Sequence, residues 1–260
     1  MIIESFRKLR NRLSGSPRER IVSESDKRFY RDEGYLIIDT GVSPSLLEGV
    51  VQEMSTQYGD WSPAAGFKSV RKLDAWEACP SVRALAAHPK VLAVLAELYG
   101  RKPLPFQTLN FPVGTEQPAH SDTVHFNSKP SGLMAGVWVA LEDIDENNGP
   151  LAFYPKSHKL PEYTLADVGV APSLDSAPVV KLILEVIARE RLEPKYSLIK
   201  KGQAVVWASN LIHGGAPQKD KSRSRHSQAT HYFFEGADYY YTPLLSEPGK
   251  PFLRNPRRIS

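Results

Sequence analysis

Apolar residues recur every three or four positions in the first third of the chain, which predicts amphipathic helices. Ser43 and Pro44 provide an N-cap and a first helical residue for a helix that runs to Tyr58. A second helix is expected over residues 81–98, and a shorter, more polar one over residues 23–31. Helices should therefore dominate the N-terminal third.

After residue 103 the pattern changes to short apolar runs separated by Pro, Gly, Asn and Asp. These runs are predicted strands: Leu104 to Phe111, Gly136 to Leu141, Leu151 to Tyr154, Ala204 to Ala208 and Gln228 to Phe234. Many short strands with turns between them are typical of a sandwich or jelly roll. One helix-like stretch, within residues 165–192, interrupts the strands and is interpreted either as a lid over a site or as packing on the sheet edge.

The length and composition favour a single domain over residues 1–260. A chain of 260 residues with 41% hydrophobic residues can bury one sizeable core, and it contains no repeat or dividing linker. Its formal net charge is only +4, and much of the excess lies in a basic N-terminal segment, residues 1–22, and in residues 254–258. Such terminal runs are typical of solvated tails, so neither a nucleic acid nor a membrane is expected as a partner.

The cysteine content and the lengths of the apolar runs indicate where in the cell the protein is expected. Cys79 is the one cysteine, so no internal disulfide can form, which is compatible with a cytoplasmic location. No apolar stretch approaches the ~20 residues that cross a bilayer, and no apolar run follows the basic N-terminus as in a signal peptide.

The motif His120-Ser121-Asp122 is the first chemical signal. On an extended strand, alternate residues point to the same face, so an imidazole and a carboxylate would project together. A further histidine from elsewhere would complete a 2-His-1-carboxylate triad, the ligand set that suits Fe(II) and leaves coordination positions open. The motif alone is also compatible with a polar surface loop.

His213 supplies the candidate third ligand. It follows a strand-like apolar run and precedes Gly214 and Gly215, which allow either a close approach of the backbone to a ligand or an ordinary turn. It lies far downstream of His120, so the two meet only in a fold that pairs distant strands, as a jelly roll does.

Two arginines precede the last predicted strand. The planar fork of Arg223 or Arg225 could hold a dicarboxylate through two parallel charge-assisted hydrogen bonds. Both arginines are equally compatible with ordinary loop charges on spacing alone.

In order along the chain, these residues resemble the phytanoyl-CoA dioxygenase family of iron- and 2-oxoglutarate-dependent oxygenases. The matching segments are Asp32-Glu33-Gly34-Tyr35, His120-Ser121-Asp122, Val137 to Asp143 with Glu146 to Leu151, Tyr154 to Lys159 and His213-Gly214. Lys156 stands where the family usually has glycine. Their order makes the resemblance much more specific than the HxD motif alone.

The resemblance implies a double-stranded β-helix, a cupin-like jelly roll that is mainly β, with N-terminal helices packed outside. It implies that His120, Asp122 and His213 hold Fe(II), and that Arg225, in preference to Arg223, binds 2-oxoglutarate with Gln107 and Trp138 nearby. The expected reaction consumes O2, releases succinate and CO2, and oxidises a C–H bond of a small-molecule substrate. Because the carboxylate ligand is present, hydroxylation is favoured over halogenation, with desaturation or cyclisation as other outcomes.

The remaining histidines are not expected to be metal ligands. His125 is the candidate for the substrate side of the site, and His158 belongs to a turn that supports the fold in the family. His88, His226 and His231 are not expected to bind metal. No segment resembles a CoA-binding site, so phytanoyl-CoA is not the expected substrate. The alternative function is a cupin-like metal-binding protein or isomerase without oxygen chemistry.

Overall fold

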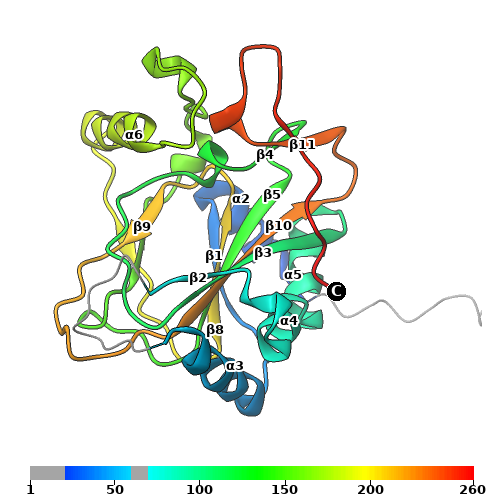
Figure 1. Cartoon of the computed structure of the whole chain (residues 1–260), viewed down its shortest axis with the longest axis vertical. Helices are drawn as coiled ribbons and strands as arrows, with labels where there is room; N and C mark the ends of the chain where they lie inside the picture. The colour runs from blue at the N-terminus through cyan, green and yellow to red at the C-terminus, as the bar shows by residue number, and fades with distance from the viewer. Residues whose placement is uncertain (1–20, 60–69) are drawn as a thin grey trace, which may run out of the picture.

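A computed structural model describes residues 21–59 and 70–260 of the chain (Figure 1). Its α-helices are α2 (Glu24–Glu33), α3 (Pro44–Gln57), α4 (Pro80–Ala86), α5 (Pro89–Tyr99) and α6 (Ala177–Arg189). Its longer strands are β1 (Tyr35–Asp39), β3 (Pro103–Phe111), β5 (Met134–Ala140), β8 (Gln203–Ala208) and β10 (Ser227–Phe234). The shorter strands are β2 (Lys72–Leu73), β4 (Asn127–Lys129), β6 (Leu151–Phe153), β7 (Lys195–Tyr196), β9 (His213–Gly215), β11 (Tyr239–Tyr241) and β12 (Leu253–Arg254).

Six antiparallel strands form the main sheet in the order β1-β8-β5-β10-β3-β2. Two smaller sheets have the orders β7-β6-β9 and β12-β11-β4. Neighbours such as β5 and β10 are far apart in sequence, which is the strand order of a jelly roll. The predicted double-stranded β-helix is therefore confirmed.

The two faces of the main sheet bury different cores because side chains alternate along each strand. Val137 points to the outer face, where α2, α3, α4 and α5 cover the sheet (Figure 1). Its neighbour Trp138 points to the inner face and packs with Phe153 of β6 in a second cluster. The inner cluster separates the main sheet from the β7-β6-β9 sheet, and the metal-binding candidates lie along this interior.

The prediction of one continuous helix over residues 81–98 is wrong. These residues form two helices, α4 and α5, which break at His88 and Pro89. Proline has no N–H and disfavours helical geometry in the preceding residue, and His88 is extended, with φ −61° and ψ 127°. The helix that begins after Ser43 is confirmed, with the Ser43 hydroxyl accepting from the Leu46 N–H.

The segment 165–192 packs behind the candidate metal site. Val179 and Ile183 of α6 form a buried cluster with Val124 and Ile212, which lie close to Asp122 and His213 in sequence. Of its described residues, none lines the cavity at the site. The lid function of this segment stays a prediction.

The basic N-terminal segment, residues 1–22, lies almost entirely outside the described residues. Across the described ranges 21–59 and 70–260, no helix is long and apolar enough to cross a membrane.

Candidate metal centre

Three buried side chains converge at the inner face of the jelly roll. One nitrogen from each of His120 and His213 and one oxygen of Asp122 all lie within 4.8 Å of one another. Nε2 of His213 is 3.8 Å from Oδ1 of Asp122. The predicted triad is therefore assembled around a single point, as one metal ion requires.

The backbone brings the two histidines together. The His120 N–H donates to the His213 carbonyl and the His213 N–H donates to the His120 carbonyl, both at 2.9 Å. This isolated antiparallel bridge joins loops that are distant in sequence. It sets the spacing of the two imidazoles without any contribution from a metal.

The HxD motif was expected on an extended strand, but only a single bridge forms, at His120. Asp122 already begins a 3-10 turn, Asp122–Val124. Ser121 is nevertheless extended, with φ −114° and ψ 141°. This conformation keeps His120 and Asp122 on one side and turns Ser121 to the other.

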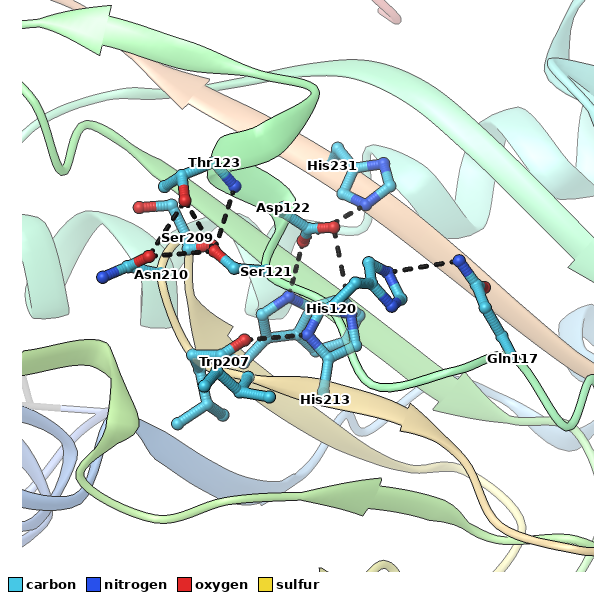
Figure 2. A network of polar contacts seen from close by, with 12 residues as sticks. Gln117, His120, Ser121, Asp122, Thr123, Trp207, Ser209, Asn210, His213 and His231 are labelled. Carbon is cyan, nitrogen blue, oxygen red and sulfur yellow. Dashed lines mark hydrogen bonds and ion pairs between the residues drawn. The ribbon is translucent and has the colours of Figure 1, made fainter. Parts of the chain in front are cut away.

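The opposite side of the motif is fixed by a polar cluster (Figure 2). The hydroxyls of Ser121 and Thr123 both donate to the Asn210 side-chain oxygen at 2.9 Å, and the Asn210 amide donates to the Leu160 carbonyl. The cluster ties the turn that carries Asp122 to the segment that leads into His213.

Gly214 and Gly215 are needed for close backbone packing. A Cβ at Gly214 would lie 2.6 Å from the Gln117 carbonyl oxygen, and one at Gly215 would lie 2.7 Å from the Glu116 nitrogen. The close approach is therefore by the segment that leads into His120. The alternative of an ordinary turn is wrong, because His213–Gly215 is the strand β9. Both glycines also line the cavity, and the close approach of their backbone to a ligand stays a prediction.

Both imidazoles are oriented for metal binding. Nδ1 of His120 lies 2.9 Å from the Pro118 carbonyl, and Nδ1 of His213 lies 2.9 Å from the Leu211 carbonyl. A carbonyl accepts the Nδ1 proton, so each Nε2 keeps its lone pair for a metal. Burial, and then the nearby His213, lower the pKa of His120 to about 3, so this ring is neutral at physiological pH.

The outer oxygen of Asp122 is held by two other rings (Figure 2). The Trp207 indole N–H donates to Oδ2 at 2.7 Å, and Nε2 of His231 is 3.5 Å from the same oxygen. Burial by itself raises the pKa of Asp122, but His231 and His213 reverse this, and the net shift is downward. The carboxylate is thus ionised, with Oδ1 left for a metal.

Trp207 reaches Asp122 only because Gly136 lacks a side chain. A Cβ at Gly136 would overlap the Trp207 ring, and the two residues pair across β5 and β8. Gly136 therefore creates the space in which the indole lies.

These donors fit a divalent metal of the iron type. Two imidazoles and one carboxylate form the 2-His-1-carboxylate set, and their remaining polar atoms are satisfied by the protein. The triad opens onto a cavity of about 320 Å³, which leaves room for further ligands.

Arg225 lines the same cavity and is only 3% exposed. Its Nη1 donates to the Ser227 hydroxyl at 2.6 Å, but its buried Nε has no partner among the described residues. The guanidinium carbon lies 5.2 Å from the Trp138 ring centre. Burial lowers the pKa of Arg225 to about 10, so the group still carries its charge at neutral pH.

Arg223 lies elsewhere. Its Nη1 forms an ion pair with Asp145 at 2.7 Å, and it does not line the cavity. The structure thus places Arg225, and not Arg223, beside the metal-binding candidates.

The other predicted site residues are also accounted for. Gln107, Trp138 and His125 all line the cavity, and the Gln107 side-chain oxygen lies 3.1 Å from Nδ1 of His231. His158 lies away from the triad, with Nε2 3.1 Å from the Arg31 carbonyl, in agreement with a supporting turn. His231 was not expected at the site, and neither were Trp207 and Gln117, whose amide nitrogen is 3.3 Å from Nε2 of His120.

Solved structures share this fold. The non-heme alpha-ketoglutarate-dependent carbocyclase SnoK from nogalamycin biosynthesis is 20% identical, with a TM-score of 0.64 over 86% of this chain and 89% of that one. EctD from S. alaskensis, crystallised with 2-oxoglutarate and 5-hydroxyectoine, is 18% identical, with a TM-score of 0.66 over 94% and 88%. These similarities show that the chain shares the jelly-roll fold of these enzymes.

The family follows from sequence comparison. The model of the phytanoyl-CoA dioxygenase family (PhyH) matches residues 30–227. Phytanoyl-CoA dioxygenase domain-containing protein 1 of Danio rerio is 25% identical, in an alignment that covers 81% of this chain and 90% of the relative. Peroxisomal phytanoyl-CoA dioxygenase of Rattus norvegicus is 22% identical over 82% of this chain and 68% of its own. The chain belongs to the phytanoyl-CoA dioxygenase family.

The substitution Trp207→Phe tests the role of the indole. It keeps an aromatic ring beside Gly136 and removes the N–H that donates to Asp122. We expect metal affinity to fall about 10- to 100-fold, as for other partners of metal ligands, in a calorimetric titration. The free energy of unfolding should fall by about 1.5–3 kcal/mol, the contribution of a hydrogen bond to a charged group.

Trp76→Phe is the matched control, because the Trp76 indole also donates to an aspartate, Asp74, away from the triad. Its metal affinity should equal that of the wild type. An unchanged metal affinity in Trp207→Phe would show that the indole does not hold the carboxylate for the metal.

Proposed function

We propose that this chain is an Fe(II)- and 2-oxoglutarate-dependent dioxygenase that hydroxylates a C–H bond of a small-molecule substrate. The observation that carries the proposal is that Arg225, a buried cation with an unpaired Nε, opens onto the same cavity as the three metal-binding candidates. A buried unpaired charge is costly, so this position favours an anionic ligand beside the metal.

His120, Asp122 and His213 would hold Fe(II) on one face and leave the other positions open. Fe(II) and 2-oxoglutarate bound there would supply the oxidising power for attack by O2 on a C–H bond, with succinate and CO2 as the products of the cosubstrate. Arg225 would neutralise the distal carboxylate of the cosubstrate through its guanidinium fork. Phe111 and Trp138 flank this guanidinium and would keep water from the pair.

The direct test is succinate release by the purified protein with Fe(II), 2-oxoglutarate and O2. The wild type should form succinate in an O2-dependent manner, and His213→Ala should reduce the rate at least about 100-fold, because the variant loses a metal ligand. Metal binding without 2-oxoglutarate binding or succinate release would favour the alternative, a cupin-like protein without oxygen chemistry.

Arg225→Ala should weaken 2-oxoglutarate binding about 10- to 100-fold while leaving metal affinity nearly unchanged, because it removes a charge-assisted contact remote from the ligand atoms. Arg225→Lys should also be impaired, since an ammonium group lacks the planar fork. Titration calorimetry of the metal-loaded protein measures both.

Arg223→Ala is the control, because Arg223 pairs with Asp145 outside the cavity. Its affinity for 2-oxoglutarate should match that of the wild type. A larger loss in Arg223→Ala than in Arg225→Ala would reverse the assignment.

The segment 165–192 should become more ordered when the site is filled. Val179 and Ile183 pack on Val124 and Ile212, which adjoin the ligand residues, so stabilising the ligand loops should also slow local opening of α6. Hydrogen exchange with and without Fe(II) and 2-oxoglutarate measures this. Clear protection around His120 and His213 with none across residues 165–192 would show that the segment is an independent insertion.

A further inference from the structure

The cavity has a second cationic side, formed by Arg71. This residue precedes β2 and lines the cavity together with Leu73, two positions further along an extended segment. Arg71 is exposed, and none of the ion pairs found within residues 21–59 and 70–260 includes it. It therefore offers a guanidinium to a ligand in the cavity.

His125 lies on the same cavity, close to the triad. Its ring centre is 6.4 Å from that of His120, and its ring nitrogens form no hydrogen bond with any described residue. Burial lowers the pKa of His125, and the nearby Arg71 and Arg254 guanidinium groups lower it further, although Asp122 opposes them. A neutral imidazole here can still donate one hydrogen bond.

Arg254 adds to the positive character of this side. Its guanidinium carbon lies 4.7 Å from the ring centre of Phe126, which lines the cavity, and its Nη1 donates to the Thr242 hydroxyl. Among the described residues that line the cavity, Asp122 is the only acidic one.

The charges of the proposed complex leave Arg71 without a counter-ion. Two positive charges on Fe(II) and one on Arg225 balance the Asp122 carboxylate and the dianion of 2-oxoglutarate. Arg71 is exposed, so water stabilises its charge until a ligand covers it, and an acidic group of the substrate would then pair with it. Arg225 is buried and Arg71 is exposed, which separates an inner cosubstrate position from an outer substrate position.

We propose that Arg71 and His125 form a subsite for an acidic group, a carboxylate or a phosphate, of the substrate. The apolar body of this substrate would lie against Leu73 and Phe126, which line the same cavity. The proposal rests on the proposed function and narrows its substrate class to small organic acids or phosphate esters.

Binding of three probes tests the subsite: benzoate, phenyl phosphate and the uncharged benzamide. Each is titrated by calorimetry into protein loaded with Fe(II) and 2-oxoglutarate without O2. At least one acid should bind at least about tenfold more tightly than benzamide, and the comparison of the two acids distinguishes a carboxylate site from a phosphate site. Equal affinity for acids and amide, or no binding of any probe, overturns the proposal.

Arg71→Gln should abolish the preference for the acid while leaving 2-oxoglutarate affinity and the melting temperature unchanged, since Arg71 is exposed and forms no ion pair with the residues that the structure describes. Arg189→Ala, which removes an exposed arginine of α6, is the control and should behave as the wild type. A loss of 2-oxoglutarate affinity in Arg71→Gln would assign Arg71 to the cosubstrate and overturn the proposal.

The two proposals fail in different ways. If the wild type does not bind 2-oxoglutarate, the proposed function fails. The same comparison of wild type and Arg71→Gln in zinc-loaded protein without 2-oxoglutarate then judges the subsite alone: an Arg71-dependent preference for the acid supports it, and the absence of that preference overturns it.

Discussion

The site depends on the pair of backbone hydrogen bonds between His120 and His213. They hold two loops that are distant in sequence at the spacing of one antiparallel bridge, so both imidazoles face one point. Gly214 and Gly215 permit this contact, because a Cβ at either position would meet the backbone of residues 116–119. The jelly roll is what brings these loops within reach, and the bridge converts that proximity into metal-binding geometry.

A buried carboxylate is the second constraint, because Asp122 must stay ionised in an interior that disfavours charge. The Trp207 indole and His231 both approach its outer oxygen, and the glycine at position 136 leaves room for the indole. The ionised state is therefore stabilised before a metal arrives. The same reasoning applies to Arg225, which is buried, donates to Ser227 and forms no ion pair with an acid among the described residues. This position supports the proposal of an anionic ligand beside the metal.

The sequence was sufficient to predict which three side chains converge, His120, Asp122 and His213, because the HxD spacing and the distal His-Gly pair are local patterns. It also predicted the longer strands, since alternation and turn residues are local as well, but it missed most of the two- and three-residue strands. It did not reveal that Trp207, His231 and Arg71 lie on the cavity, because their positions follow from strand pairing and not from any motif. The break at Pro89 was readable, but the continuous apolar spacing on both sides obscured it.

The most direct measurement is a crystal structure of the protein soaked anaerobically with Fe(II) and 2-oxoglutarate, with diffraction collected on both sides of the iron absorption edge. We expect one anomalous peak about 2.0–2.2 Å from a nitrogen of His120, a nitrogen of His213 and an oxygen of Asp122, with the distal carboxylate of 2-oxoglutarate at Arg225. Iron bound elsewhere, or a metal site from which any of the three side chains is turned away, would contradict it.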